Sequence, residues 1–206
     1  MCRPDYLTQI ENRIFNAPFG KVFIPSDFLD IADTTAVRKA LSRLTESGQI
    51  RRIIRGVYDR PYFSAFLMEH AAPDIEQVAK AIARNFGWHI IPCGDTALNL
   101  LKLSTQVPAV WQYVSDGPYR EYAIGNLQLK FKHTSNKDIS GQSYKTALIT
   151  QALKALGKDY IDDTIRNKLS AVLTTEDLSI ALAETQHGTV WIYETIKSIV
   201  GKEKPK

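Results

Sequence analysis

Hydrophobic residues recur at helical spacing in two stretches near the start of the chain. The first runs from Tyr6 to Asn16, and the second from Thr34 to Ser47. Between them, Lys21 to Ile24 is typical of a short strand, and Ser26 to Ile31 predicts a brief helix whose N-cap lies at Pro25-Ser26-Asp27. In the second stretch one stripe is apolar and the opposite face is polar. The stripe is formed by Val37, Ala40, Leu41 and Leu44.

A basic hairpin follows directly, because Gly48 is a helix stop and Gln49 to Tyr58 alternates between apolar and arginine positions. The alternation slips by one residue at Ile53-Ile54, where we expect a tight turn or a bulge. Pro61 cannot continue a central strand and ends the unit. Helix, strand, helix, helix, strand, strand is the element order of a winged helix-turn-helix.

The remainder of the chain predicts a larger mixed α/β domain that ends in helices. A connecting segment with some helical character, Ser64 to Pro73, leads into it. The expected helices and strands are a helix at Asp74 to Asn85, a strand at Phe86 to Pro92, a helix at Thr96 to Leu103, strands at Val110 to Ser115, Arg120 to Ala123 and Leu127 to His133, and helices at about 141–156, 159–173, 176–186 and 190–200. The predicted fold class is therefore α+β. We expect a winged helix at residues 1–62, a second domain at 63–206 and a linker at about 59–73.

Charge is concentrated in the predicted helix and hairpin. The chain has 206 residues and a formal net charge of +4, yet the segment from Thr34 to Arg60 holds seven positive and two negative side chains. That excess of +5 leaves the rest close to neutral. The positive residues are Arg38, Lys39, Arg43, Arg51, Arg52, Arg55 and Arg60. This distribution favours a polyanionic partner for the first domain.

The helix from Thr34 predicts a DNA-reading face. Thr35, Arg38 and Ser42 lie at i, i+3 and i+7, with Lys39 beside them and Arg43 at the edge. In a major groove Arg38 would pair with guanine, Thr35 and Ser42 would meet bases or phosphates, and the other two cations would meet phosphates. Taken alone, such a face is more often only solvated.

The hairpin changes that interpretation. Arg51, Arg52 and Arg55 would reach flanking phosphates or a narrow minor groove, and helix and hairpin in tandem favour DNA binding.

A group of aromatic and basic residues lies in the predicted second domain. It consists of Trp111, Tyr113, Tyr119 and Tyr122, near Lys130, Lys132 and His133. The group suggests either an interaction surface or, more simply, core packing with a solvated strand face.

Other chemistry is sparse. Cys2 and Cys93 have no partners at disulfide or zinc spacing, the four histidines are scattered, and no phosphate-binding loop occurs. We therefore expect no catalytic residues, cofactor or metal. Neither a signal core nor a run of about 20 apolar residues is present. These features predict a soluble cytoplasmic protein without a membrane partner.

The stretch from Gly48 to Tyr58, together with Pro92-Cys-Gly-Asp-Thr-Ala-Leu-Asn-Leu-Leu-Lys-Leu-Ser-Thr-Gln-Val-Pro108, resembles the AbiEi-type antitoxins over most of the chain. The resemblance implies a type IV toxin-antitoxin or phage-abortive-infection system. Its antitoxin represses its own promoter at inverted repeats, as a monomer or a dimer. The C-terminal domain would counter a nucleotidyltransferase toxin, commonly without a stable complex.

Two alternatives follow from the residues themselves. One is a stand-alone winged-helix regulator whose second domain senses a ligand or dimerises. The other is an enzyme acting on nucleic acid with the winged helix as its targeting module, against which the absence of an acidic, histidine or phosphate-loop cluster argues.

Overall fold

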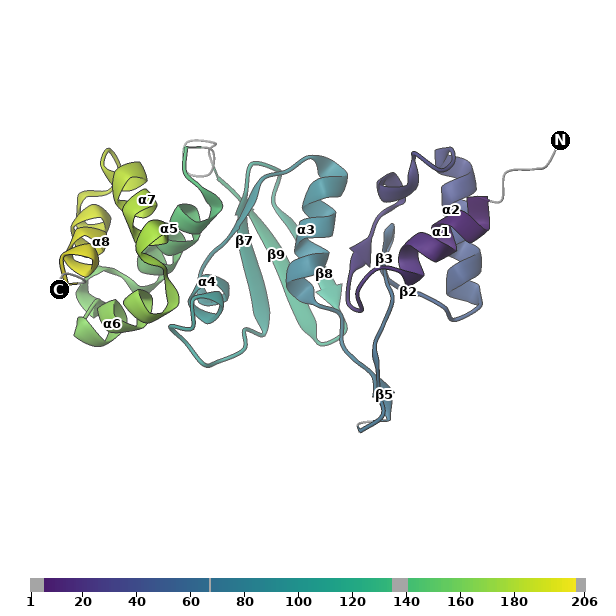
Figure 1. Ribbon diagram of the computed structural model, residues 1–206, viewed down its shortest axis with the longest axis horizontal. Coiled ribbons are helices and arrows are strands. Elements are labelled where there is room, and N and C mark those ends of the chain that lie inside the picture. Colours follow the sequence, from purple (N-terminus) through teal and green to yellow (C-terminus); the bar gives the residue numbers. More distant parts are fainter. Residues whose placement is uncertain (1–5, 67, 135–140, 203–206) are drawn as a thin grey trace. The chain divides into compact units, whose positions relative to one another are not determined.

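The protein has an α+β fold, seen in a computed structural model that describes residues 6–66, 68–134 and 141–202 (Figure 1). Its contacts divide the chain into two compact units, residues 1–87 and 88–206. We expected the boundary at residues 62–63, and the contacts instead divide after Gly87. Within the described residues, no helix is long and apolar enough to cross a membrane.

The first unit begins with the element order that the sequence predicts. It contains α1 (Tyr6–Phe15), β1 (Val22–Phe23), the 3-10 helix η1 (Pro25–Phe28), α2 (Thr34–Glu46), β2 (Arg51–Ile54) and β3 (Val57–Asp59). The three strands form an antiparallel sheet in the order β1-β3-β2. Helix α1 lies across α2 (Figure 1), and the side chains of Ile10, Phe28 and Leu41 are fully buried in the shared core.

The brief helix expected at Ser26 to Ile31 is instead the shorter η1. Its backbone bonds close after three residues, as from Asp27 N to Ile24 O at 3.0 Å, which is the 3-10 pattern. The Asp27 carboxylate also accepts a hydrogen bond from the Ile24 N–H. The local bonds thus favour a tight turn over a continued helix.

Helix α2 starts and stops where its capping residues dictate. The Asp33 side chain accepts hydrogen bonds from Thr35 N at 2.8 Å and Ala36 N at 2.9 Å, which satisfies two otherwise unpaired N–H groups. Gly48 follows the helix at a φ of +74°, a conformation that glycine adopts without strain. The Ile50 N–H bonds to Leu44 O, so the chain turns directly from α2 into β2.

The β2–β3 hairpin contains the predicted irregularity. Ile54 pairs with Val57, and the two-residue turn between them places Gly56 at a φ of +80°. The register shifts between Arg52 and Ile54, which confirms the slip expected from the sequence.

Beyond β3 the chain forms a second hairpin rather than the expected segment with helical character. Strands β4 (Phe63–Ser64) and β5 (Glu69–His70) pair in antiparallel fashion. Helix α3 (Ile75–Phe86) then contacts β1 and β3. Arg84 Nη2 bonds to Val22 O at 3.4 Å and to Asp27 Oδ2 at 3.2 Å. These contacts explain why α3 belongs to the first unit.

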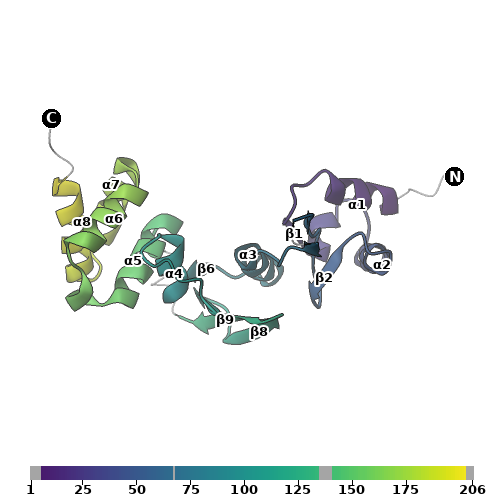
Figure 2. The same cartoon turned by 90° about the horizontal axis from the view of Figure 1, so that it is seen from below.

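The second unit combines a mixed sheet with a helical layer (Figure 2). Its strands are β6 (Ile90–Pro92), β7 (Val110–Ser115), β8 (Arg120–Ile124) and β9 (Leu127–His133), in the order β6-β7-β9-β8. Strands β7 and β9 are parallel, and the other neighbours are antiparallel. The helices are α4 (Asp95–Leu100), α5 (Tyr144–Leu156), the 3-10 helix η3 (Lys158–Tyr160), α6 (Asp163–Val172), α7 (Thr175–Thr185) and α8 (Val190–Lys202).

The helix boundaries in this unit differ most from the sequence prediction at α4 and α6. Helix α4 stops at Leu100, and Lys102 adopts a φ of +55° just beyond it. The helix expected from residue 159 is divided into η3 and α6, because the Asp162 side chain accepts a bond from Ile165 N and caps a new helix. Helices α4 to α8 enclose the largest apolar core, around Leu153, Leu169 and Ile196.

Candidate nucleic-acid interface

Helix α2 separates an apolar stripe from a polar face, as its sequence predicts. Val37, Ala40, Leu41 and Leu44 are buried, with at most 4% of each exposed. The opposite face is exposed and carries all the predicted DNA-contact residues of the helix, namely Thr35, Arg38, Lys39, Ser42 and Arg43. The buried stripe holds the helix on the unit, so this face is presented by a rigid element.

On that face, Ser42 already forms one hydrogen bond within α2. Its hydroxyl donates a hydrogen bond to Glu46 Oε1 at 2.9 Å, one turn further along α2. The proton is used in that bond, while the hydroxyl oxygen keeps lone pairs that accept hydrogen bonds. The Ser42 hydroxyl oxygen can therefore accept a hydrogen bond from an amino group.

The three arginines of the hairpin differ in their surroundings. Arg52 and Arg55 are exposed, the second in the two-residue turn beside Gly56. Arg51 is half-buried, and its guanidinium contacts both oxygens of the Asp59 carboxylate, with Nε to Oδ1 at 3.0 Å and Nη2 to Oδ2 at 2.6 Å. Its Nη1 also donates to Ala71 O at 3.0 Å.

The Arg51 contacts give this residue a structural role within the hairpin. Only 2% of the Asp59 side chain is exposed, so this carboxylate needs a counter-charge, and Arg51 supplies it. Arg51 thus stabilises the hairpin, and its expected contact with phosphate stays a prediction. The sequence signal that could have indicated this ion pair is the placement of Arg51 directly across the hairpin from Asp59.

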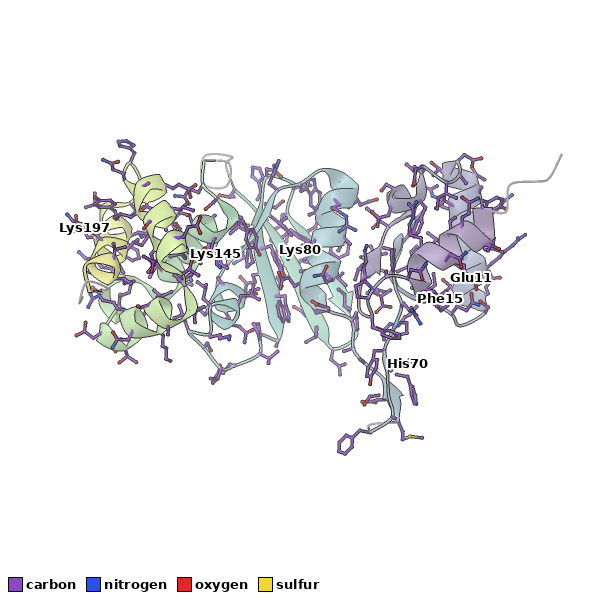
Figure 3. The ribbon with its side chains drawn as sticks, in the orientation of Figure 1. Glu11, Phe15, His70, Lys80, Lys145 and Lys197 are labelled. Carbon is purple, nitrogen blue, oxygen red and sulfur yellow. The ribbon has the colours of Figure 1, made fainter. Side chains whose placement is uncertain are left out.

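Arg60 is also engaged within the unit. Its Nη1 donates to Phe15 O at 2.7 Å, and the guanidinium lies 4.4 Å from the Phe15 ring centre and 4.3 Å from that of Phe19. Phe15 and Glu11 both project from α1 (Figure 3), and Glu11 accepts a hydrogen bond from Gln49 at the start of the hairpin. These contacts hold α1 against both ends of the hairpin, at Gln49 before β2 and at Arg60 after β3.

Five cations remain available on α2 and the hairpin. They are Arg38, Lys39, Arg43, Arg52 and Arg55, and none of them takes part in an ion pair within the described part of the chain. Because α2 leads directly into β2, the five lie on two consecutive elements of one unit. This arrangement suits contact with a polyanion.

The aromatic and basic group of the second unit is divided between the sheet core, where Tyr113 is buried, and the surface, where Tyr119, Lys132 and His133 are exposed. Tyr113 is 1% exposed, and its ring lies 5.9 Å from that of Phe131 in the sheet core. Lys130 forms an ion pair with Glu121 at 3.0 Å. The hydrogen bond from Tyr119 and then that from Lys130 lower the pKa of the Glu121 carboxyl. These contacts match the core-packing interpretation better than a shared interaction surface.

Other reactive side chains are isolated. No group of three or more His, Cys, Asp or Glu residues that could hold a metal ion occurs among the described residues. His89 Nδ1 lies 2.8 Å from Asp116 Oδ2; burial raises the pKa of this carboxyl, but the bonds from His89 outweigh that effect and lower it. Cys93 is free, burial raises the pKa of its thiol, and Cys2 lies outside the described residues.

Comparisons with known proteins assign a family. The sequence profile of DUF6088, described as a family of unknown function, matches residues 9–180, and the chain belongs to this family. No curated protein matches the chain. Among solved structures, it is similar to the crystal structure of the RV2827C protein from Mycobacterium tuberculosis, at 12% identity and a TM-score of 0.43, over 98% of this chain and 83% of that chain. A similarity this weak carries no argument about function.

Proposed function

We propose that this DUF6088 protein is a winged helix-turn-helix protein that binds double-stranded DNA, with α2 as the recognition helix and the β2–β3 hairpin as the wing. The observation that carries the proposal is the set of five exposed cations without internal ion pairs on these two consecutive elements. The element order and the β1-β3-β2 sheet also support it.

The proposed roles differ along α2. A helix of 13 residues is about 20 Å long and fits a major groove. Arg38, with Thr35 and Ser42 on the same face, would contact base edges, and the acceptor oxygen of Ser42 suits an adenine or cytosine amino group. Lys39 and Arg43, at the edge of that face, would neutralise phosphates.

The hairpin would add contacts beside the groove. Arg55 in the turn and Arg52 on the exposed face of β2 would meet flanking phosphates or a narrow minor groove. Arg51 has no assigned role in this proposal, because its Nε, Nη1 and Nη2 each already donate one hydrogen bond to Asp59 or Ala71 O. The target in this proposal is the protein's own promoter, read at inverted repeats by a monomer or a dimer in the cytoplasm.

Substitution of one base-facing and one phosphate-facing arginine tests these roles. Arg38→Ala should cost about 1 to 3 kcal/mol on the operator and relax its specificity. Arg52→Ala should weaken operator and random DNA evenly and reduce the salt slope by about one unit. Lys197→Ala is the matched control, because it removes one exposed positive charge from α8 in the second unit (Figure 3). Titrations of labelled duplexes measure all three.

Two outcomes would contradict this division of roles. One is an equal loss on operator and random DNA for both Arg38→Ala and Arg52→Ala. The other is an equal loss for Lys197→Ala, which would mean that overall charge alone governs binding.

We further propose that the second unit counters a nucleotidyltransferase-type toxin, without requiring a stable complex. This part of the proposal rests on the AbiEi resemblance, and no antitoxic residue is assigned. Co-expression with the product of the adjacent gene tests it by scoring growth. The full chain should restore growth, and the Arg38→Ala/Arg52→Ala double variant should do so as well, because repression and neutralisation would use different units.

Failure of the full chain to restore growth would remove the antitoxin half of the proposal. If operator binding persisted in that case, the alternative would hold, namely a stand-alone winged-helix regulator with a ligand-sensing or dimerisation domain. The presence of a neighbouring nucleotidyltransferase gene would argue against that alternative.

A further inference from the structure

Strands β4 and β5 form a hairpin that projects from the rest of the first unit (Figure 1). Its base is fixed by two bonds, from Ala71 N to Tyr62 O at 2.8 Å and from Arg51 Nη1 to Ala71 O at 3.0 Å. The rings of Phe63 and His70, the latter labelled in Figure 3, lie 5.3 Å apart and edge to face across the two strands. These contacts hold the side chains of the β4–β5 hairpin on a defined surface.

Large apolar side chains gather on this hairpin and are exposed. Phe66 is 93% exposed, Met68 is 76% exposed, and about half of Tyr62 and of Phe63 is exposed. Phe19 adds a fifth exposed side chain, because its ring packs edge to face on that of Tyr62 at 5.6 Å. We call these five residues the apolar hairpin surface.

The extent of the apolar hairpin surface is comparable to what a stable protein interface needs. A whole aromatic side chain covers about 150 to 250 Å², so the exposed parts of the five side chains amount to roughly 500 to 700 Å². Specific interfaces bury about 600 to 1,000 Å² on each partner. An exposed apolar patch larger than a few hundred Å² marks an interaction site.

The charge of the segment indicates that its partner is not a polyanion. No Lys or Arg occurs from Pro61 to Ala79, and the same segment holds Glu69, Asp74 and Glu76. Proteins that insert apolar wedges into the DNA minor groove also use Arg or Lys there, and anionic membranes attract basic segments. The β4–β5 hairpin has the apolar side chains without the cations, which favours a protein partner.

The β4–β5 hairpin also leaves the wing at the end opposite to its turn. Arg51 pairs with Asp59 at one end of the β2–β3 hairpin, and Ile54 pairs with Val57 beside the turn at the other end. The chain leaves β3 at the Asp59 end and then enters β4. A partner on the apolar hairpin surface therefore leaves the turn that carries Arg55 uncovered.

We propose that the apolar hairpin surface is the contact between two copies of this chain. A two-fold dimer joins the same patch of both copies, so the patch must be complementary to itself. The stretch from Tyr62 to Met68 carries no charged side chain, so two copies meet there without repulsion between like charges. Together they bury roughly 1,000 to 1,400 Å², which corresponds to a reversible dimer. The inference rests on the proposed function only in that a two-fold pair fits inverted repeats.

Sedimentation equilibrium of the full chain without DNA tests the dimer separately from DNA binding. The mean mass should rise from the 23.2 kDa of one chain toward twice that value as the concentration increases from about 1 to 100 µM, a range that suits an interface of this size. A mass that stays at 23.2 kDa over that range would overturn the proposal, whether or not the chain binds its operator.

One substitution on the hairpin and one matched control assign the contact. Phe66→Asp places two like charges at the two-fold contact and should weaken dimerisation about thirtyfold or more, as the loss of a central anchor residue does. Because Phe66 is almost fully exposed, this variant should keep the thermal unfolding midpoint of the monomer. Tyr160→Asp changes a 76% exposed aromatic residue of η3 in the second unit and should leave the dimer intact. Equal losses in both variants, or a dimer that survives Phe66→Asp, would refute the contact.

Two further outcomes would assign the apolar hairpin surface to another partner. In the first, a monomeric chain floats with neutral phosphatidylcholine vesicles and Phe66→Asp does not, which would identify a lipid surface. In the second, a monomeric chain loses affinity for duplex DNA in Phe66→Asp, which would identify a groove-inserting wedge. Either result would overturn the assignment to a second copy.

Discussion

At the scale of single residues, two neighbouring arginines of the hairpin have opposite roles. Side chains alternate between the two faces of a strand, so Arg51 and Arg52 point to different surroundings. Arg51 meets the buried Asp59 carboxylate, and Arg52 is exposed. A run of basic residues therefore overstates the charge that a strand offers to DNA whenever one of its faces holds an acid.

This difference predicts opposite results for the two substitutions. Arg51→Ala leaves the Asp59 carboxylate without its counter-charge, and the free energy of unfolding should fall by about 3 kcal/mol. Arg52→Ala removes an exposed side chain and should change it by about 0.5 kcal/mol or less. Urea denaturation of both variants measures the difference.

A double substitution supplies the control. In Arg51→Ala/Asp59→Asn the buried charge is absent, so part of the lost stability should return, and a double-mutant cycle would show coupling between the two sites. Additive losses in that cycle, or equal destabilisation by Arg51→Ala and Arg52→Ala, would mean that the ion pair has no structural role.

At the scale of elements, local signals predicted most of the helices and strands. The helical spacing of apolar residues indicated α1 and α2, and the slip at Ile53-Ile54 indicated the bulge in β2. The exposed face of α2 was also predictable, because it is the complement of a clear apolar stripe. These features depend on neighbours within a few residues of each other.

The errors at this scale involve tertiary contacts or weak local patterns. Strands β4 and β5 form a hairpin in which Phe63, Phe66 and Met68 are exposed, so no pattern of buried positions identified it. The parallel pairing of β7 with β9 joins strands separated by β8, and turn signals indicate neighbours in sequence only. Helix α3 contacts β1 across a long separation in sequence, so no local pattern indicates that packing.

At the scale of the whole molecule, the excess of positive charge lies in α2 and the β2–β3 hairpin of the first unit. The chain carries a net charge of +4, and the five free cations of α2 and the hairpin account for a positive surface that internal ion pairs do not neutralise. Phosphate contacts release counterions, so the proposed DNA binding through this surface would depend steeply on salt.

Salt-dependent footprinting of the full chain on the DNA upstream of its own gene tests the central proposal most directly. Lys39, Arg43, Arg52 and Arg55 are the assigned phosphate contacts, so log K should fall linearly with log salt with a slope of about −3 to −4. Protection should cover inverted repeats at modest salt and fade as salt rises. Absence of protection at modest salt, or protection with a slope near zero, would contradict DNA binding through α2 and the hairpin.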